Sequence, residues 1–161
     1  MYSRILVPLD RSATALCALE QAAVLARLSG GTIVLLHVVE ELDHATGFES
    51  AKVYTEDVEP TFLAAGQAML EQAAAPLRKD GVTVETLLRQ SRGERVATLI
   101  VKETAAANCD IVIMGTHGRH GIGRVLLGSD AEQVARLSPV PVMLVRHAQA
   151  GGARPDSGAG G

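Results

Sequence analysis

Two kinds of hydrophobic pattern alternate along the 161-residue chain. Short, continuous apolar runs predict buried strands, whereas apolar residues that recur every three or four positions predict amphipathic helices. The strands are predicted at 5–9, 32–39, 82–88, 111–114 and 142–145. The helices are predicted from Ser12 to Gly30, from Pro60 to Lys79, from Glu94 to Asn108 and from Ser129 to Leu137. This regular alternation indicates an α/β fold with a parallel sheet.

The composition of the predicted strands indicates how they are arranged. The run Thr32–Val39 is apolar on both faces, as expected for a strand inside a parallel sheet. In contrast, 82–88 alternates between apolar and polar residues, which predicts a strand nearer the sheet edge with one wetter face. With right-handed crossovers, we expect a single-domain, doubly wound, Rossmann-like sheet of five strands with four helices. If its strands follow the order 3-2-1-4-5, the order reverses between the first and the fourth strand. This domain is expected to span residues 1–147.

Three segments depart from this pattern. The acidic stretch between Glu40 and Glu59 lacks clear periodicity and predicts a lid or an irregular partial helix. Pro76 falls late in the helix that begins at Pro60, where it is expected to kink or shorten the last turns. Residues 148–161 are rich in glycine and alanine and cannot bury a core, so we expect a disordered tail.

Composition and charge argue against several classes of function. Apolar residues make up 47% of the chain and aromatic residues only 2%, so the core must be aliphatic. A net charge of −3 without stacking aromatics argues against nucleic-acid binding. No segment is long enough to span a membrane, and the apolar start is too short for a signal peptide, so we expect a cytoplasmic protein. Cys17 and Cys109 lie far apart without metal-binding spacing, which indicates small buried hydrophobic residues.

The candidate chemistry lies between Gly115 and Ser129, a stretch that reads G-T-H-G-R-H-G-I-G-R-V-L-L-G-S. It links a predicted strand to a predicted helix, and its glycines allow the backbone to approach a ligand closely. The first amides of the helix lack partners and favour an anion such as phosphate, while Arg119 and Arg124 add positive charge. Ser129 is expected either to cap the helix or to turn its hydroxyl towards a phosphate. A glycine-rich connection without any ligand is the alternative.

The spacing within this loop is more specific than its glycine content. It fits neither the P-loop nor the dinucleotide-binding glycine pattern. From Gly115 it reads G-x2-G-x9-G-S, which resembles the nucleotide-binding signature of the universal stress protein family, in its ATP-binding branch. The resemblance extends from about Ser3 to Arg146 and implies bound ATP, with a nucleotide-bound Mg²⁺ that Asp10 could help to hold.

The resemblance assigns roles to particular residues. Asp10 would accept hydrogen bonds from ribose hydroxyls or help to hold Mg²⁺; a carboxylate that forms the turn before the first helix is the alternative. Pro8 and Val38 would flank or hydrogen-bond the adenine, Val38 through its main chain, although either could be an ordinary core residue. If the sheet order holds, Asp10 and Gly115 face one crevice. The residues implied to bind the nucleotide are Pro8, Asp10, Val38, Met114, Gly115, Thr116, His117, Gly118, Arg119, Gly121, Gly128, Ser129, Asp130 and Ala131.

The polar residues around the loop do not assemble a catalytic site. His37 lies on an apolar strand and is expected to be a hydrogen-bonded structural residue. His117 and His120 could contact phosphates or be solvated, and neither has an acidic or serine partner at a recognisable spacing, so we assign no catalytic base. Asp130 stands where the family commonly has an aliphatic residue. It complements the helix dipole, but it would repel a terminal phosphate unless Mg²⁺ lies between them or the side chain points to solvent.

The leading hypothesis is a small ATP-binding protein of the universal stress type, in which the nucleotide sets the conformation or partner choice of a homodimer. The resemblance places the dimer contact on the last strand, at Val140 to Val145, whose apolar edge would otherwise lack a partner. The alternatives are a dimeric scaffold that needs no nucleotide and an adenylating enzyme of related fold, whose H-x-G-H and K-M-S-K-S signatures are missing. We expect no activity beyond a slow ATPase.

Overall fold

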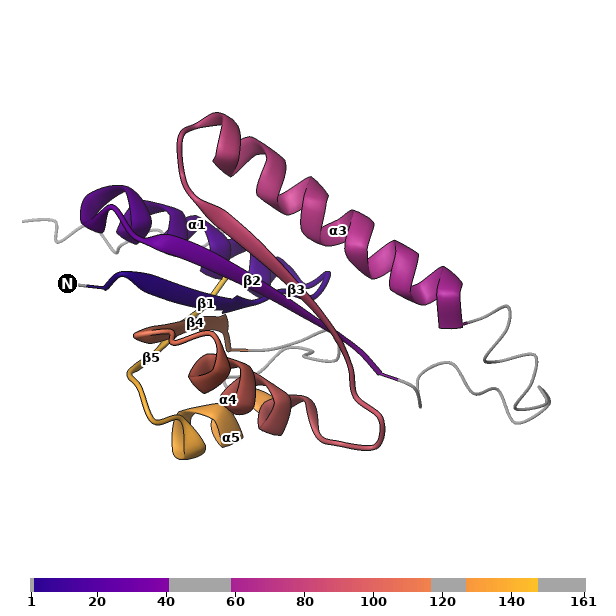
Figure 1. Cartoon of the computed structure of the whole chain (residues 1–161). Coiled ribbons are helices and arrows are strands. Elements are labelled where there is room, and N and C mark those ends of the chain that lie inside the picture. Colours follow the sequence, from indigo (N-terminus) through magenta and orange to yellow (C-terminus); the bar gives the residue numbers. More distant parts are fainter. Residues whose placement is uncertain (1, 41–58, 117–126, 148–161) are drawn as a thin grey trace, which may run out of the picture.

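The computed structural model describes residues 2–40, 59–116 and 127–147, which form one sheet with helices on both faces (Figure 1). The strands are β1 (Arg4–Pro8), β2 (Thr32–Val39), β3 (Val84–Gln90), β4 (Ile111–Gly115) and β5 (Val142–Val145). The helices are α1 (Ala13–Ser29), α3 (Glu59–Lys79), α4 (Val96–Ala106) and α5 (Ser129–Leu137). The predicted α/β fold is confirmed.

The five strands are parallel, and their order is β3-β2-β1-β4-β5, as predicted. β1 is central: it pairs with β2 along its whole length and with β4 through Ile5↔Ile111 and Leu6↔Val112. β3 is an edge strand with a partly exposed burial pattern, which confirms the prediction from its alternating sequence. The direction in which strands are added reverses between β1 and β4.

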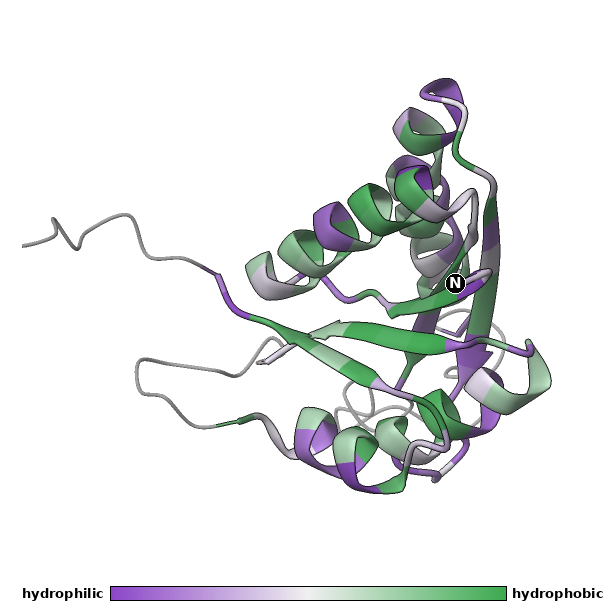
Figure 2. Ribbon diagram, turned by 90° about the vertical axis from the view of Figure 1, so that its left-hand side faces the viewer, coloured by the Kyte–Doolittle hydropathy of each residue, from purple (hydrophilic) through white to green (hydrophobic). Residues whose placement is uncertain are grey.

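Two apolar clusters lie on opposite faces of the sheet. One joins α1 and α3 to strand residues such as Val7 and Leu35, and the other joins α4 and α5 to the intervening residues, such as Leu6 and Val34. The clusters alternate along each strand because successive side chains point to opposite faces. Figure 2 shows the hydrophobic strands between the two helix layers. Burial on both faces explains the continuous apolar runs of the central strands.

Both ends of α1 follow the predicted signals, whereas the expected shortening of α3 is not found. Ser12 caps α1 because its side chain accepts a hydrogen bond from the amide of Ala15, and Gly30 ends this helix with a φ of 67°. Pro76, however, does not shorten α3, which continues to Lys79. The proline lies on the exposed side of the helix, where water can satisfy the carbonyl group that it leaves without an amide partner.

Two predicted boundaries move because local hydrogen bonds form turns. Val82 precedes β3 instead of opening it, since its amide donates to the carbonyl of Leu77 in the turn after α3 (3.0 Å). Glu94 likewise precedes α4, since its amide donates to the carbonyl of Ser91 (2.7 Å). The other boundaries agree to within about two residues, the usual uncertainty of element ends.

The segment 41–58, predicted as a lid, and the predicted tail at 148–161 lie outside the described residues. The predictions made for them, and the domain boundary at 147, therefore stay predictions. Within the ranges that the structure does describe, no helix combines the length and the apolar content that crossing a membrane requires.

Candidate functional site

The candidate site is the switch point, by which we mean the carboxyl ends of β1 and β4 together with the segments that follow them. After β1 the chain turns into α1 on one face of the sheet, and after β4 it continues to α5 on the other face (Figure 1). In open α/β sheets, ligands bind where the connections separate in this way. Asp10 follows β1 and Thr116 follows β4, so the two predicted segments meet here.

Asp10 forms the turn that leads into α1. Its Oδ1 accepts hydrogen bonds from the amide of Ser12 (2.9 Å) and from the hydroxyl of Ser12 (2.5 Å). The turn-forming carboxylate, which was the alternative to a ligand role, is therefore present. Oδ2 makes no hydrogen bond to a described residue, and Asp10 is half-buried, so this second oxygen is available to a ligand.

Gly115 is required by the close packing of β4 against α1. A Cβ atom added to Gly115 would lie 2.6 Å from Oγ1 and 2.7 Å from Cβ of Thr14, closer than non-bonded atoms approach. The glycine therefore serves the contact between strand and helix, whatever ligand binds nearby. Sequence reasoning placed Gly115 in a phosphate loop and missed this role, because no local pattern pairs it with Thr14.

A hydrogen bond joins the two ends of the glycine-rich loop. The amide of Gly128 donates to the carbonyl of Thr116 (2.7 Å), and the amide of Thr116 donates to the carbonyl of Val145 on β5 (2.9 Å). Thr116 is also buried, so the base of the loop is anchored to the sheet. The predicted loop residues outside the described ranges are His117, Gly118, Arg119, His120, Gly121 and Arg124.

α5 begins at the base of this loop. Its N-cap is Gly128 (φ −61°, ψ 150°), which forms no side-chain hydrogen bond, so the prediction that Ser129 caps the helix is wrong. Ser129 is instead the first helical residue. The first intrahelical bond runs from the amide of Glu132 to the carbonyl of Gly128 (2.9 Å). The amides of Ser129, Asp130 and Ala131 therefore have no partner within the helix.

The first turn of α5 also carries two carboxylates, Asp130 and Glu132, both exposed. Glu132 pairs with Arg136 one turn further along (2.6 Å), whereas Asp130 forms no ion pair with a described residue. Negative charge in this turn stabilises the helix, but it opposes an anion at the same amides. The hydroxyl group of Ser129 is exposed and does not cap the helix. Its other predicted role, a contact with a phosphate, stays a prediction.

Val38 presents main-chain groups to the switch point. The even-numbered residues of β2 turn their peptide groups towards β1, since the amide of Leu9 donates to the carbonyl of Leu36 (2.7 Å). β1 ends at Pro8, which pairs with Leu36, so the peptide groups of Val38 lie beyond its end and bond to no other described residue. The side chains of Val38 and Met114 are buried in the cluster under α4 and α5.

His37 has the structural role that its sequence context predicted. Its Nδ1 lies 2.8 Å from the carbonyl oxygen of Leu9 and, because a carbonyl only accepts, Nδ1 carries the proton. On the other side of the ring, a Cβ added to Gly66 of α3 would lie 2.9 Å from Cδ2 of His37. His37 thus links β2 to the turn that carries Asp10, and α3 packs against it.

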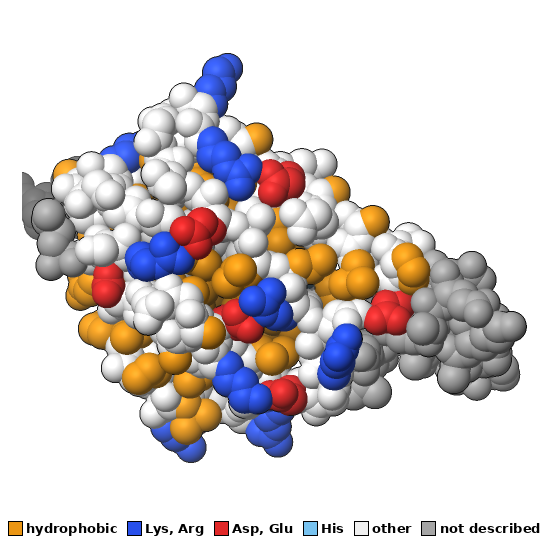
Figure 3. Space-filling model, viewed as in Figure 1, with side chains coloured by type: hydrophobic (Ala, Val, Ile, Leu, Met, Phe, Trp, Pro, Cys, Tyr) orange, Lys and Arg blue, Asp and Glu red, His pale blue; other side chains and the backbone are white. Residues whose placement is uncertain are grey.

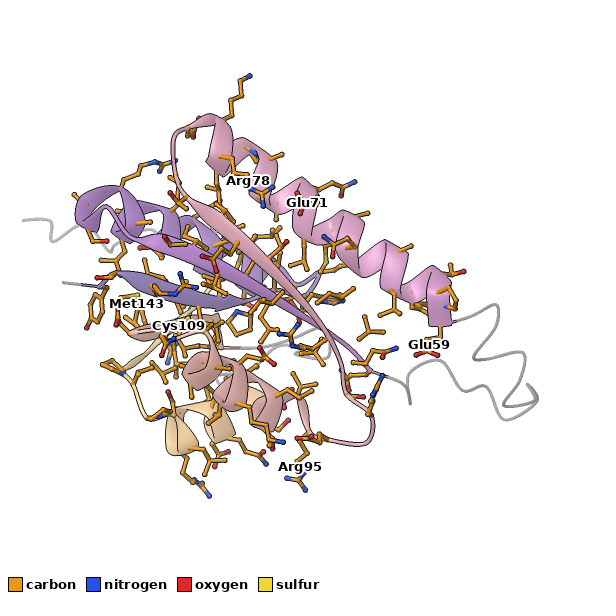
Figure 4. The ribbon with its side chains drawn as sticks, in the orientation of Figure 1. Glu59, Glu71, Arg78, Arg95, Cys109 and Met143 are labelled. Carbon is orange, nitrogen blue, oxygen red and sulfur yellow. The ribbon has the colours of Figure 1, made fainter. Side chains whose placement is uncertain are left out.

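Several ionisable groups with displaced pKa values lie at the amino ends of the strands, opposite the switch point. The amides of Arg4 and Ser3 donate to Asp110 and lower the pKa of its carboxyl group, and the guanidinium of Arg4 lowers the pKa of Glu85 in the same direction. Cys109, which is labelled in Figure 4, has its pKa raised to about 11 by burial. This thiol therefore stays protonated at neutral pH and is a small buried residue, as predicted, whereas Cys17 on α1 is only partly buried.

The described part of the switch point offers hydrogen-bonding groups: a carboxylate oxygen, a main-chain donor and acceptor pair, and the free amides of a helix. Among the described residues, no three His, Cys, Asp or Glu side chains are arranged to hold a metal ion. This arrangement can bind a polar, anionic ligand.

Comparison with known proteins gives a consistent family. The model of the universal stress protein family matches residues 1–146. Universal stress protein MJ0577 of Methanocaldococcus jannaschii is 28% identical over 158 residues, which cover 91% of this chain and 96% of that protein. The solved structure of MJ0577 has a TM-score of 0.81 and 27% identity, and the match covers 93% of this chain and 99% of that one.

Two further solved universal stress proteins share the fold and hold ligands. One, from Archaeoglobus fulgidus, was solved in complex with dAMP; it has a TM-score of 0.59 and 24% identity, with 89% of this chain and 98% of that chain covered. The other was solved in complex with cAMP; it has a TM-score of 0.63 and 21% identity, with coverages of 89% and 97%.

Proposed function

Because the chain belongs to the universal stress protein family, we propose that it binds an adenine nucleotide at the switch point, with ATP as the expected ligand. The two ligands held by the solved relatives, dAMP and cAMP, have an adenine base, a sugar and a phosphate in common, which supports this class of ligand. ATP itself is expected because the glycine-rich loop resembles the signature of the ATP-binding branch of the family.

One observation carries the proposal: groups suited to base, ribose and phosphate follow adjacent strands in that order. The peptide groups of Val38 on β2 suit the hydrogen-bonding edge of adenine, and Oδ2 of Asp10 after β1 suits a ribose hydroxyl. The free amides at Ser129 on α5, beyond β4, suit a phosphate. Strands lie about 4.8 Å apart, so this series spans roughly 10 Å, comparable with a nucleotide.

The remaining contacts of the proposal belong to the glycine-rich loop and to Mg²⁺. We place the loop residues His117, Gly118, Arg119 and Gly121 beside the phosphates, on the family resemblance. Mg²⁺ would neutralise phosphate charge, and Asp10 is a carboxylate of the type that this ion accepts as a single ligand. Such an ion would also reduce the repulsion between Asp130 and a terminal phosphate.

The proposed biological role is that of a regulatory homodimer in the cytoplasm, whose nucleotide sets its conformation or choice of partner. We place the dimer contact on the edge strand β5, from Val140 to Val145. Hydrolysis should be slow or absent, since the described switch point contributes hydrogen bonds and helix amides and no acid–base pair. A dimer that needs no nucleotide is the alternative, favoured by the carboxylates in the first turn of α5.

Titration of the purified chain with ATP and Mg²⁺, together with mass spectrometry of co-purified nucleotide, tests the proposal. We expect saturation at one nucleotide per chain, and weaker binding by the variants Gly118→Val and Ser129→Ala. Ser3→Ala is the matched control, because Ser3 is an exposed serine at the amino end of β1, away from the switch point. This variant should bind ATP as the wild type does. If binding does not saturate at about 1 mM ATP, the affinity is very weak. That result would contradict the proposal and favour the dimeric scaffold that needs no nucleotide.

The variant Asp130→Asn tests the placement of the phosphates. Removing this charge should tighten ATP binding about two- to fivefold, because the carboxylate shares the first turn of α5 with the amides proposed to bind the phosphate. AMP lacks the outer, negatively charged phosphates of ATP, so its affinity should change less in this variant. An unchanged affinity for ATP would indicate that the phosphates lie away from α5.

A further inference from the structure

Ser12 occupies the centre of a hydrogen-bond chain beside the proposed ribose position. Its hydroxyl lies 2.5 Å from Oδ1 of Asp10, 3.2 Å from the amide of Ala15 and 3.2 Å from Oγ1 of Thr14. Its own amide also donates to Oδ1 of Asp10 (2.9 Å). The residue that caps α1 is therefore the same residue that holds the carboxylate.

The direction of two of these hydrogen bonds follows from the groups involved. A backbone amide only donates, so the hydroxyl oxygen of Ser12 accepts from Ala15. A carboxylate only accepts, so the single hydroxyl proton of Ser12 is donated to Asp10. Ser12 thus uses a lone pair for the helix and its proton for the carboxylate, and one hydroxyl group serves both.

Both bonds from Ser12 end on the same carboxylate oxygen, which fixes the orientation of Asp10. Oδ1 is turned towards α1, and Oδ2 is left as a single acceptor. Thr14 also holds this arrangement in place: it contacts the hydroxyl of Ser12 and packs directly against Gly115 of β4. A side chain held in its binding orientation before the ligand arrives loses less conformational entropy on binding.

We propose that Ser12 is a positioning residue of the nucleotide site: it holds Asp10 so that Oδ2 accepts a hydrogen bond from a ribose hydroxyl. The inference rests on the proposed function, since it concerns the same site. It differs from simple helix capping, which requires only the bond from Ala15 and would not couple Ser12 to the ligand.

A double-mutant cycle between Ser12→Ala and Asp10→Ala, read out as ATP affinity, separates positioning from capping. In the wild-type background, Ser12→Ala should weaken ATP binding about three- to tenfold, the factor expected for the loss of one net hydrogen bond. In the Asp10→Ala background, Ser12→Ala should leave the affinity unchanged while still lowering the melting temperature. Ser12→Thr keeps the hydroxyl group and should restore wild-type affinity.

The sugar is tested with 2′,3′-dideoxy-ATP, which lacks both ribose hydroxyls. The wild type should prefer ATP to this analogue, and Ser12→Ala should reduce that preference. Ser29→Ala is the matched control, because the side chain of Ser29 also accepts a hydrogen bond from a backbone amide, that of Gly31, at the other end of α1 (3.2 Å). It should lower stability without changing ATP affinity.

Three results would overturn the inference. If Ser12→Ala weakens ATP binding equally with and without Asp10, Ser12 acts through helix stability, and the proposed nucleotide site still stands. If Ser12→Ala affects ATP and the dideoxy analogue to the same extent, Asp10 does not contact the sugar. If the wild type shows no saturable binding of ATP, both the proposed function and this inference fail.

Discussion

The two edge strands of the sheet differ in what happens to their outward peptide groups. On β3, the guanidinium of Arg78 donates to the carbonyl of Val84 through Nε (3.2 Å) and Nη2 (3.1 Å). Arg89 donates through Nη1 to the carbonyl of Leu88 (3.0 Å). Both carbonyls belong to residues whose peptide groups point away from β2. The β3 edge is therefore partly closed by side chains of the same chain.

Carboxylates keep these arginines in place. Glu71 of α3 pairs with Arg78 (2.6 Å), and Glu103 of α4 binds Arg89 through both of its oxygens (2.7 and 2.9 Å). Figure 4 shows Glu71 and Arg78 together on α3 above the strand. In Figure 3, which views this face, basic and acidic side chains lie in adjacent pairs with apolar atoms between them.

The β5 edge has no comparable closure among the described residues. The carbonyls of Pro141 and Val145 accept bonds from β4 and the residue after it, so the peptide groups of Val142 and Leu144 point outward. No side-chain hydrogen bond to either of them is found in the described ranges. Met143 between them is 41% exposed. Figure 2 looks onto this side, where β5 is coloured as hydrophobic.

The difference shows how one sheet can direct self-association to one edge. An open strand edge is a template for another strand, and charged side chains on an edge prevent such pairing. Because β3 is partly closed by arginines and β5 is open among the described residues, we expect a second copy of the chain to add its strand at β5. This is the physical basis for the proposed homodimer, and it can be tested by changing either edge.

The largest effect is expected from Met143→Lys on β5. A lysine at the centre of the proposed contact would face its own copy across a two-fold axis. The dissociation constant of the dimer should therefore rise by roughly 100-fold or more. Sedimentation velocity measures the change. Leu16→Lys, which alters a comparably exposed apolar residue on α1, is the control and should remain dimeric. An unchanged mass for Met143→Lys would place the interface elsewhere.

A smaller effect is expected when the β3 edge is opened by Arg78→Ala with Arg89→Ala. The free energy of unfolding should fall by about 2 kcal/mol, because both carbonyls lose donors and the partly buried Glu103 loses its partner. Urea denaturation measures this loss. In a Met143→Lys background, this double variant should also associate at concentrations where Met143→Lys alone is monomeric.

The control for this opened edge is Arg136→Ala, which removes an exposed ion pair within α5 and should change stability by less than about 0.5 kcal/mol. If the double arginine variant loses stability but gains no tendency to associate, the arginines stabilise β3 without protecting its edge.

The smallest effect is a pH dependence at the same edge. The hydrogen bond from Arg78 lowers the pKa of Glu71 below its ordinary value of 4.5 in the folded chain. This pair therefore adds stability above pH 4.5, and the contribution is lost as the pH falls through the lowered pKa. Glu71→Gln should be slightly less stable than the wild type at pH 7, and the urea midpoints should converge in acid. Midpoints that stay equally far apart at low pH would contradict the assignment.

The order of the elements was predictable because burial leaves a local record in the sequence. Strands buried on both faces, such as Thr32–Val39, read as continuous apolar runs, and capping signals such as Ser12 mark helix starts. The sheet order then follows from the resemblance and from the rules for parallel folds. Boundaries were less predictable, since the hydrogen bonds that place Val82 and Glu94 in turns leave no periodic trace.

The sequence predicted which segments form the candidate site, but it predicted the individual contacts within the site less well. The switch point and the positions of Asp10 and Val38 follow from the strand order. The role of Gly115 could not be predicted, because it depends on contact with Thr14, which is distant in sequence. The cap of α5 shifts from the expected Ser129 to Gly128, whose amide is held by Thr116 across the loop.

That bond between Gly128 and Thr116 has a consequence for the divergence of such proteins. The chain leaves the described framework at Thr116 and re-enters it near Gly128, and because these two residues share a hydrogen bond, the two ends of the intervening segment are held side by side. With the ends held in this way, a longer segment should cost little extra to close, because doubling the length of a loop adds only about 0.6 kcal/mol. Since we propose that this segment contacts the phosphates, exchanging it for another sequence should change the ligand preference while the described framework is kept.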